Sequence, residues 1–326
     1  MLGYLVSRIA QGLSLLLVMS MLVFVAVYAI GNPITMLINP AAPAEVVEET
    51  IRRLGLDQPI HVQYWRFLEQ ALQGNLGVSY ISSRPALQLI LERFPATLEL
   101  TISAMVIASV FGIPAGLVTG YWPRAWFSRL IGTLSVVGIS LPSFWIGLML
   151  ITTFSIRYGW LPTGGRGEVG VFLGMESSLF TTNGLRHVVL PALNLSFFPL
   201  AMIVRLTRAG VRENIAASHI RYARAKGLTP TRILFRYMLP SIAIPLVTVL
   251  GIIFGVLLAY GVVTETVFAW PGIGKLIIEA IRTGDRPVVI AYLLFTVLLF
   301  TLINLTVDLA CALIDPRIVL AKVGAA

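Results

Sequence analysis

The sequence ASHIRYARAKGLTP, residues 217–230, lies between two long apolar parts of the chain. It is the centre of a basic segment, residues 205–240, in which eight Lys/Arg accompany a single acid, Glu213. A segment with this charge belongs in water or on a partner rather than in lipid. The eight cations are Arg205, Arg208, Arg212, Arg221, Arg224, Lys226, Arg232 and Arg236.

The residue types at the centre of this segment predict a helix, a turn and a second helix. Ser218 is a suitable N-cap, residues 221–226 favour a helix, and Gly227 can take the left-handed conformation that ends one. Thr229 and Pro230 suit the N-cap and the first position of the next helix. We therefore expect a compact unit that docks on a partner.

Composition places the chain in a membrane. It has 326 residues, of which 57% are hydrophobic and 12% are charged, and its mean hydropathy is +0.88. A soluble domain carries about 25% charged residues. The surplus of apolar side chains is therefore expected to face lipid.

Six runs with little or no charge are long enough to span a bilayer. The first follows Arg8, but it is longer than the apolar core of a signal peptide and no small-residue cleavage site follows it. We therefore expect an uncleaved span, and the predicted fold class is an all-α polytopic membrane protein with six transmembrane helices. The runs are residues 9–30, 97–119, 131–156, 187–204, 241–263 and 288–307.

Particular residues within the runs predict how the helices pack. Gly112 and Gly116, like Gly251 and Gly255, have the GxxxG spacing that lets two helices approach closely. Glu99 lies close to the end of the second run, where we expect an interfacial carboxylate. Prolines are expected to kink or interrupt their helices, and they are Pro114, Pro142, Pro191 and Pro199.

The distribution of Lys and Arg predicts the orientation in the membrane. With six spans, both termini lie on one side, which holds thirteen Lys/Arg and three acids, whereas the other side holds eleven of each. Short loops rich in Lys/Arg stay in the cytoplasm. Both termini and residues 205–240 are therefore predicted to be cytoplasmic, and residues 31–96 and 264–287 to face outward. The excess of positive charge then lies on the cytoplasmic side, so the net charge of +9 is explained without a nucleic-acid partner.

Three parts follow from this topology. Residues 1–30 form an N-terminal tail with the first span. Residues 31–96 form a periplasmic cap segment on the outer face, with helices expected at 44–54 and 64–72. Residues 97–326 form the transmembrane core.

The sequence contains no pattern for nucleotide binding, metal binding or catalysis. The run 272–276 lacks the first glycine and the hydroxyl residue of a phosphate-binding loop. His61, His187 and His219 are too far apart to suggest a metal site, and Cys311 is the single cysteine. No Ser/His/Asp set falls within the spans. Ion-coupled carriers usually bury charged residues in the middle of a span, and no span of this chain has one there. We therefore expect a non-enzyme without cofactor or metal, which takes its energy from another subunit.

The basic segment resembles the cytoplasmic coupling loop of ABC importer permeases. That loop reads Glu-Ala-Ala, three residues, Gly, nine residues and Ile-x-Leu-Pro. Aligned on Gly227, this chain keeps Ala223, Leu239 and Pro240. In the peptide-importer branch the loop reads Tyr-x-Arg-x-Ala-Arg-Ala-Lys-Gly-Leu, which is similar to HIRYARAKGL at 219–228. The departures from the general pattern are Arg221, Tyr222 and Tyr237.

Further motifs resemble the same branch in the same order along almost the whole chain. Asn75 stands where Asp is usual in that branch. Together the motifs are similar to the B-type permease of the dipeptide, oligopeptide, nickel and glutathione importers. They are LGLDQP at 54–59, GNLG at 74–77, SLPSF at 140–144, ETVF at 265–268, WPGIG at 270–274, Asn304, Asp308 and DPR at 315–317.

The resemblance implies a type I ABC importer permease fold with a short cytoplasmic coupling helix, in a bacterial inner membrane. It implies a non-catalytic subunit that moves short peptides, dipeptides or oligopeptides; glutathione, a nickel chelate or another small solute is the alternative with the same architecture. The implied partners are a second homologous permease in a heterodimer, two ABC ATPases, a periplasmic or lipoprotein solute-binding protein and membrane lipid. ATP and Mg²⁺ would be used by the ATPases, and this chain would bind no cofactor.

The resemblance also implies two groups of site residues. The WPGIG loop has an alternative interpretation, a turn that leads into an interfacial helix at 275–282, and aromatic residues at span ends are often interface anchors. The residues expected to couple to the ATPases are Arg221, Tyr222, Ala223, Arg224, Ala225, Lys226, Gly227 and Leu228. The candidates for the transport pathway or outer gate are Tyr260, Glu265, Phe268, Trp270, Pro271 and Gly272.

A self-sufficient carrier or channel is the alternative from another functional class. Genes beside this one that encode a second six-span protein and nucleotide-binding ATPases would exclude it. A receptor would need a folded soluble domain, which the sequence does not indicate.

Overall fold

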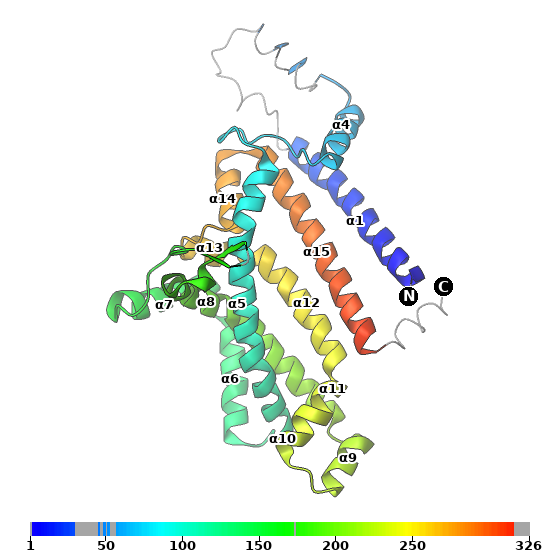
Figure 1. Cartoon of the computed structure of the whole chain (residues 1–326), viewed down its shortest axis with the longest axis vertical. Coiled ribbons are helices and arrows are strands. Elements are labelled where there is room, and N and C mark those ends of the chain that lie inside the picture. Colours follow the sequence, from blue (N-terminus) through cyan, green and yellow to red (C-terminus); the bar gives the residue numbers. More distant parts are fainter. Residues whose placement is uncertain are drawn as a thin grey trace.

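The computed structural model describes an elongated helical molecule (Figure 1). The described residues are 2–29, 45, 48–49, 51–52, 57–172 and 174–315. In chain order the elements are α1 (Leu2–Ala29), α4 (Ile60–Leu72), α5 (Ala86–Tyr121), α6 (Trp126–Ser140), α7 (Ser143–Leu150), the π-helix η1 (Ile151–Arg157), β1 (Gly170–Phe172), β2 (Met175–Ser177), the 3₁₀-helix η2 (Ser178–Phe180), α8 (Thr182–Asn214), α9 (Ser218–Ala225), α10 (Pro230–Ile233), the π-helix η3 (Leu234–Met238), α11 (Leu239–Ser241), α12 (Ala243–Tyr260), α13 (Val262–Val267), α14 (Ile273–Thr283) and α15 (Arg286–Ile314).

Five of the described helices, α1, α5, α8, α12 and α15, are long and apolar enough to cross a membrane. A sixth span exists if α6 and the helix that continues through α7 and η1 are counted as one, although the two parts are bent by 105°. The bend falls at Pro142, which has no N–H to continue the helical ladder. Pro114 lies inside α5, and Pro191 and Pro199 lie inside α8, without interrupting the helix. The all-α class is confirmed, and the predicted third span is sharply bent.

Two helices extend beyond the apolar runs that predicted them. α5 begins at Ala86 rather than at residue 97, so the predicted boundary between cap and core falls inside one continuous helix. α8 continues to Asn214 rather than ending near residue 204, so the first three arginines of the basic segment lie on a helix. Arg and Lys are good helix formers, so charge marks where a helix leaves lipid but not where it ends. The cap contains α4, and most of the predicted helix at 44–54 lies outside the described residues.

The α5–α8 pair is the main packing unit, and small residues allow its close approach. Gly112, Gly116 and Gly120 lie one above another on the face of α5 that meets α8. A Cβ added to Gly116 would overlap Thr207 and lie 2.9 Å from the carbonyl oxygen of Val204. The predicted GxxxG contact is confirmed here. Alanines on the same face continue the contact into the main apolar core, which includes Ala96, Ala104, Ala108, Val188, Ala192, Ile203, Ile253 and Trp270.

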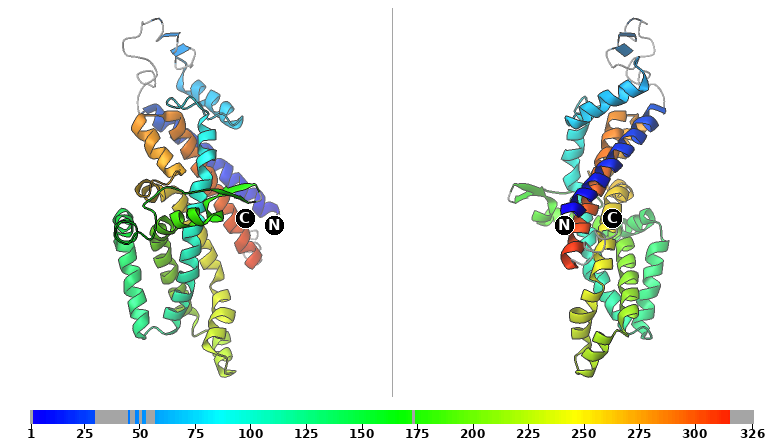
Figure 2. Two further views of the ribbon diagram at one scale, coloured as in Figure 1. Left: turned by 60° about the vertical axis from the view of Figure 1, so that its left-hand side comes forward. Right: turned by 90° about the vertical axis from the view of Figure 1, so that its right-hand side faces the viewer.

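The second glycine pair packs α12 against α15. A Cβ on Gly251 would overlap Val307, and a Cβ on Gly255 would lie 2.8 Å from Cε1 of Phe300. α15 also contacts α1 along its length, and Figure 2 keeps these two helices together in both views. Arg8 near the start of α1 donates a 2.9 Å hydrogen bond to Asp308 near the end of α15. The first and last spans are therefore held together by an ion pair.

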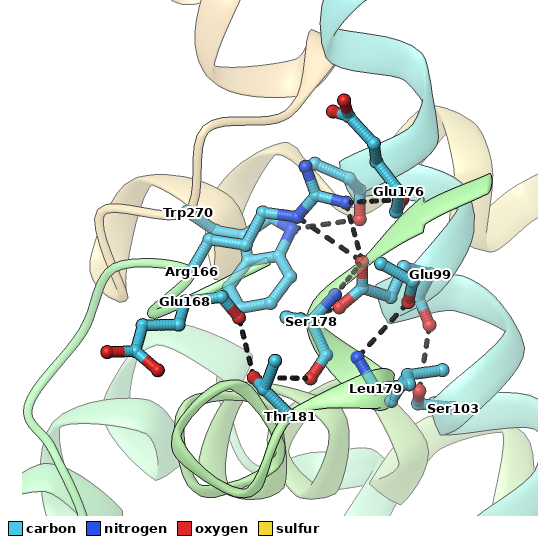
Figure 3. Close-up of polar contacts among 11 residues, drawn as sticks. Glu99, Ser103, Arg166, Glu168, Glu176, Ser178, Leu179, Thr181 and Trp270 are labelled. Carbon is cyan, nitrogen blue, oxygen red and sulfur yellow. Dashed lines mark hydrogen bonds and ion pairs between the residues drawn. The ribbon is translucent and has the colours of Figure 1, made fainter. Parts of the chain in front are cut away.

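A short hairpin beside the N-terminal half of α5 is tied to this helix by a buried charge pair. β1 and β2 are antiparallel, with Gly170 opposite Ser177. The Arg166 guanidinium, just before the hairpin, donates to Glu99 Oε2 over 2.7 Å from Nη2 and 3.2 Å from Nε. Ser178 adds its hydroxyl and its backbone N–H to the same carboxylate (Figure 3).

This pair corrects the prediction of an interfacial carboxylate at Glu99. The Glu99 side chain is 4% exposed and that of Arg166 is 15% exposed. Burial of a carboxylate is tolerated when a cation and hydrogen-bond donors replace water. The sequence could not show this, because the cation lies 67 residues further along the chain.

We expect Gly116→Ala to weaken the α5–α8 contact. The added methyl meets a backbone carbonyl and a branched side chain, and such overpacking costs about 1–3 kcal/mol. Denaturant unfolding of the purified protein in detergent measures the change. Gly138→Ala is the matched control, because the nearest atom to its added Cβ is 3.9 Å away. Equal stability of the two variants would contradict the close helix contact.

We expect Glu99→Gln to lower the free energy of unfolding by about 3 kcal/mol, because it leaves the Arg166 charge without its buried partner. The matched control is Glu92→Gln, which removes an ion pair with Arg84 whose side chains are 44% and 47% exposed. An exposed ion pair contributes little to the free energy of unfolding. Unfolding in detergent micelles compares the two variants, and a loss at Glu99 no larger than at Glu92 would show that the buried pair does not anchor the hairpin.

Candidate functional site

The centre of the basic segment folds as a small unit at the end of the molecule opposite to α4 (Figure 1). This coupling unit, defined here as residues 215–240, contains α9, α10, η3 and the first residues of α11. Ile220 and Ala223 of α9 are buried against Leu117 of α5 and Met238 of η3. Ala223 therefore packs inward and does not lie on the outer face of the helix. The unit is fixed to the lower end of α5 by an apolar core of its own.

The turn between α9 and α10 has the geometry predicted for it. Gly227 has φ +71°, and its N–H donates to the Arg224 carbonyl over 2.9 Å. The Leu228 N–H donates to the Ala223 carbonyl over 3.3 Å, and Leu228 packs on the apolar core. These two bonds are those of a Schellman motif, which requires a left-handed residue best supplied by glycine. Pro230 occupies the first turn of α10, as expected.

One capping prediction was off by one residue. α9 begins at Ser218, and the N-cap position belongs to Ala217, which has extended backbone and no side-chain oxygen to accept a hydrogen bond. The start of α9 is instead fixed by the burial of Ile220. Tertiary packing here overrides the capping preference of the sequence.

The outer face of the coupling unit is cationic and carries an exposed aromatic ring. Tyr222 is 63% exposed, and the Lys226 ammonium lies 4.6 Å from the centre of its ring. The Arg224 guanidinium lies 5.1 Å from the ring centre of Tyr121 at the end of α5. These cation–π contacts hold two of the charges in place. The exposed residues of the face are Arg221, Tyr222, Arg224, Ala225, Lys226 and Gly227.

A second group of predicted residues forms a buried joint between α13, α14 and α5. Glu265 Oε1 accepts a 2.6 Å hydrogen bond from the Thr97 hydroxyl of α5, and Oε2 accepts the Lys275 N–H over 2.9 Å. The Thr97 oxygen in turn accepts the Ile273 N–H over 2.9 Å. The carboxylate therefore caps the N-terminal turn of α14, where N–H groups lack helical partners. A Cβ on Gly272 would collide with this carboxylate, so the close approach requires glycine.

Burial and hydrogen bonding shift the pKa of the Glu265 carboxyl group in opposite directions. Glu265 lies in α13, which follows the spanning helix α12 in the chain. Burial raises the pKa of Glu265 above its ordinary value, because removal from water disfavours the anion. The hydrogen bonds from Thr97 and from the backbone N–H groups of Lys275 and Gly274 lower the pKa and offset part of that rise. The joint is thus a closed polar network inside an apolar core.

The aromatic residues of the outer loop also lie inside the chain. Trp270 is fully buried, and its indole N–H donates to the Ala96 carbonyl of α5 over 2.9 Å. Phe268 is buried, and its carbonyl accepts the Gly165 N–H over 2.8 Å. Tyr260, by contrast, is 75% exposed. In the conformation described, the loop therefore fastens α13, α14 and the segment before the hairpin to α5, and a role in the pathway stays a prediction.

Sequence reasoning missed a buried polar contact at the centre of the same region. Asn194 of α8 donates from Nδ2 to the Thr264 hydroxyl of α13 over 2.9 Å. Its Oδ1 has no hydrogen-bond partner among the described residues, and a Cβ added to Gly147 of α7 would lie 3.5 Å from it. An amide within the apolar run 187–204 was the available signal. Within the described part of the chain, no group of three or more His, Cys, Asp or Glu side chains is placed to hold a metal ion.

Comparison with known proteins gives family matches to both the N-terminal and the C-terminal part of the chain. Residues 112–320 match the family "Binding-protein-dependent transport system inner membrane component". Residues 1–101 match the N-terminal component of the same transport systems. The glutathione transport system permease protein GsiC of Escherichia coli K12 is 39% identical over 319 residues, which cover 98% of this chain and 99% of that protein. GsiC of Shigella dysenteriae serotype 1 is similar to the same extent, 39% over 319 residues, with 98% and 99% covered.

Solved structures agree on the fold. The MetNI methionine ABC transporter, in two crystal forms of its inward-facing conformation, matches with TM-scores of 0.53 and 0.56 at 20% and 19% identity. Each match covers 70% of this chain and 97% of the solved one. The shared part is a type I importer permease fold. The chain therefore belongs to the family of inner-membrane permease components of binding-protein-dependent ABC importers, as a multi-pass subunit that is not itself catalytic.

Proposed function

We propose that this permease moves short peptides across a bacterial inner membrane, together with ATPase subunits that its coupling unit contacts. The observation that carries the proposal is the coupling unit itself, an apolar-anchored helix–turn–helix with an exposed cationic face. The similarity of residues 219–228 to the peptide-importer branch supports the substrate class. So does the 39% identity to proteins named for glutathione transport, since glutathione is a tripeptide.

The coupling step follows from how this unit is attached. Two partner ATPases bind and hydrolyse ATP with Mg²⁺, and each receives one coupling unit. The contact residues on this chain are the exposed ones among residues 221–228, and their cations pair with acidic or carbonyl groups on the ATPase. They are Arg221, Tyr222, Arg224, Ala225, Lys226 and Gly227. Because Ile220 and Ala223 share an apolar core with Leu117 of α5, a displacement of the unit moves α5 rather than bending a loop. The differential contacts of the two ATPase states then drive the spans between inward-open and outward-open.

The same attachment carries the displacement to the outer side. α5 is 36 residues long and extends from the coupling unit to the outer joint. Thr97, Ala96 and Glu99 on its outer half hold α14, Trp270 and the hairpin. The pathway candidates Glu265, Phe268, Trp270, Pro271 and Gly272 would therefore move with α5 as one body, whereas Tyr260 lies exposed at the end of α12.

The full transporter needs partners, which are those that the resemblance to this family implies. A second, homologous permease forms a heterodimer with it and completes the pathway at their interface, and a solute-binding protein delivers the peptide on the outer side. Both termini lie in the cytoplasm. The ion pair that brings the start of α1 beside the end of α15 supports a common side for the two ends, and the cytoplasmic assignment rests on the excess of Lys/Arg.

Glutathione is the second candidate substrate, favoured by the names of the similar permeases. A self-sufficient carrier is disfavoured by the family membership. Proteoliposomes that contain the two permeases, the ATPases and the binding protein test the proposal through uptake of labelled Leu-Ala and labelled glutathione. We expect ATP-dependent uptake of Leu-Ala. Uptake of glutathione without Leu-Ala would replace the proposed substrate, and uptake of either without ATPases would refute the proposed coupling.

We expect Gly227→Asp to uncouple ATP hydrolysis from uptake without loss of membrane insertion. No heavy atom lies within 4 Å of the added Cβ, so the fold is retained, but the change strains a left-handed residue and places an anion on the cationic face. Loss of one central contact at an interface typically costs about 2 kcal/mol, or more than tenfold. Uptake and ATPase rates in the same vesicles measure the ratio.

The matched control is Gly159→Asp. Gly159 is also left-handed, with φ +64°, and its added Cβ also has no heavy atom within 4 Å, but it lies outside the coupling unit. It carries the same backbone strain and the same added charge, so we expect a normal ratio of uptake to hydrolysis. A normal ratio in Gly227→Asp as well would argue strongly against a coupling role for this turn.

A further inference from the structure

A cavity of about 820 Å³ lies between the outer half of α5 and the hairpin. Its walls are largely apolar, and it is separate from the buried joint around Glu265. Its volume is within the range of pockets that bind small molecules, about 300–1,000 Å³. The apolar residues on its walls include Leu91, Phe94, Leu98, Ile102, Leu179 and Phe180.

The polar part of this cavity consists of the charge pair that holds the hairpin and two further acids. Glu99 is buried, and its carboxylate is fully engaged by Arg166 and Ser178. Glu92 forms an ion pair with Arg84. Glu176, on β2, is exposed, and its backbone carbonyl accepts a 3.4 Å hydrogen bond from Arg166.

The carboxylate of Glu176 is the uncompensated charge of the cavity. No hydrogen bond or ion pair joins it to another described residue, and in Figure 3 it lies above the Arg166 guanidinium with no contact drawn between them. The remaining charges at the walls are paired. A ligand that fits this arrangement carries a cation beside an apolar group, because the cation can pair with Glu176 while the apolar group contacts α5 and the hairpin.

We propose that this cavity binds the ammonium group at the N-terminus of a peptide during its passage, with the first side chain against the apolar wall. This inference rests on the proposed function, which supplies short peptides as the substrate class. It also predicts a preference within that class. In glutathione the ammonium group stands beside a free α-carboxylate, because the peptide bond uses the γ-carboxyl group, and that carboxylate is repelled by Glu176. Peptides with an ordinary, apolar first residue are therefore favoured.

Protection of a single cysteine from maleimide tests the proposal in the complete complex. Cys311 is the single cysteine of this chain and is replaced by serine, and Ile102→Cys places a thiol in the cavity wall, where Ile102 is 43% exposed. The other subunits are used in cysteine-free form. The rate of labelling by N-ethylmaleimide in proteoliposomes is measured with Leu-Ala, N-acetyl-Leu-Ala or S-methylglutathione. At about ten times its half-saturating concentration, Leu-Ala should slow labelling by about tenfold.

The controls test whether protection depends on the ammonium group of the peptide and on the carboxylate of Glu176. N-acetylation removes the ammonium charge and should abolish protection, and S-methylglutathione should protect much less than Leu-Ala. Glu176→Gln should abolish protection by Leu-Ala. Glu168→Gln removes an exposed carboxylate from the same segment that does not line the cavity, and it should leave protection unchanged. Leu134→Cys, in an apolar groove on α6, should not be protected.

Several outcomes would overturn the proposal. Equal protection by the acetylated peptide, or full protection in Glu176→Gln, would show that the ammonium group is not recognised here. A thiol at position 102 that does not label even without peptide would show that another subunit fills the cavity. Uptake of Leu-Ala by the same vesicles without protection of the thiol at position 102 would overturn the proposed role of the cavity and leave the proposed function standing. Absence of any peptide uptake would overturn both.

Discussion

The structure depends on how closely α5 and α8 can approach. Apolar side chains gain little from leaving lipid for a protein interface, so helices in a membrane associate through close packing and polar contacts. Three glycines and several alanines on one face of α5 provide that packing against α8. A larger residue at Gly116 would separate two backbones that now meet at a carbonyl oxygen. Since α6, α7 and α12 to α15 each contact at least one of these two helices, their spacing sets the position of most of the core.

The attachments divide by chemistry along α5. At the C-terminal end of α5, the coupling unit is held by apolar side chains around Ile220 and Met238. At its upper end the contacts are polar and directional, from Thr97 to Glu265, from Ala96 to Trp270 and from Glu99 to Arg166. Apolar packing resists separation, and buried hydrogen bonds fix orientation. A helix with both kinds of attachment can carry a displacement from the coupling unit to the outer loop without losing register at either end.

The sequence was sufficient wherever one segment's own residues decide its structure. The left-handed Gly227, Pro230 at the start of α10 and the glycine pairs could all be identified in this way, because each reflects a local steric requirement. It was insufficient wherever a residue's environment comes from a distant segment. Glu99 was assigned to an interface because Arg166 could not be placed beside it, and Ala223 was expected to contact an ATPase because the core beneath α9 was not evident from the sequence. The same limit applies to Phe268 and Trp270, whose burial depends on α5 and on the segment before the hairpin.

The carboxylates near the outer end of α5 show how structural and functional charge can be told apart. Glu265 is enclosed by a hydroxyl and backbone N–H groups, and Glu99 is enclosed by a guanidinium and a serine. To bind a passing solute, either would first have to lose hydrogen bonds to a charged group, each of which contributes about 1.5–3 kcal/mol. Glu176 has no such bonds to lose among the described residues and already lies beside an apolar wall. A carboxylate that holds the fold has its hydrogen-bond positions filled by other residues of the chain. A carboxylate that recognises a substrate must keep at least one of these positions free, and Glu176 meets that condition.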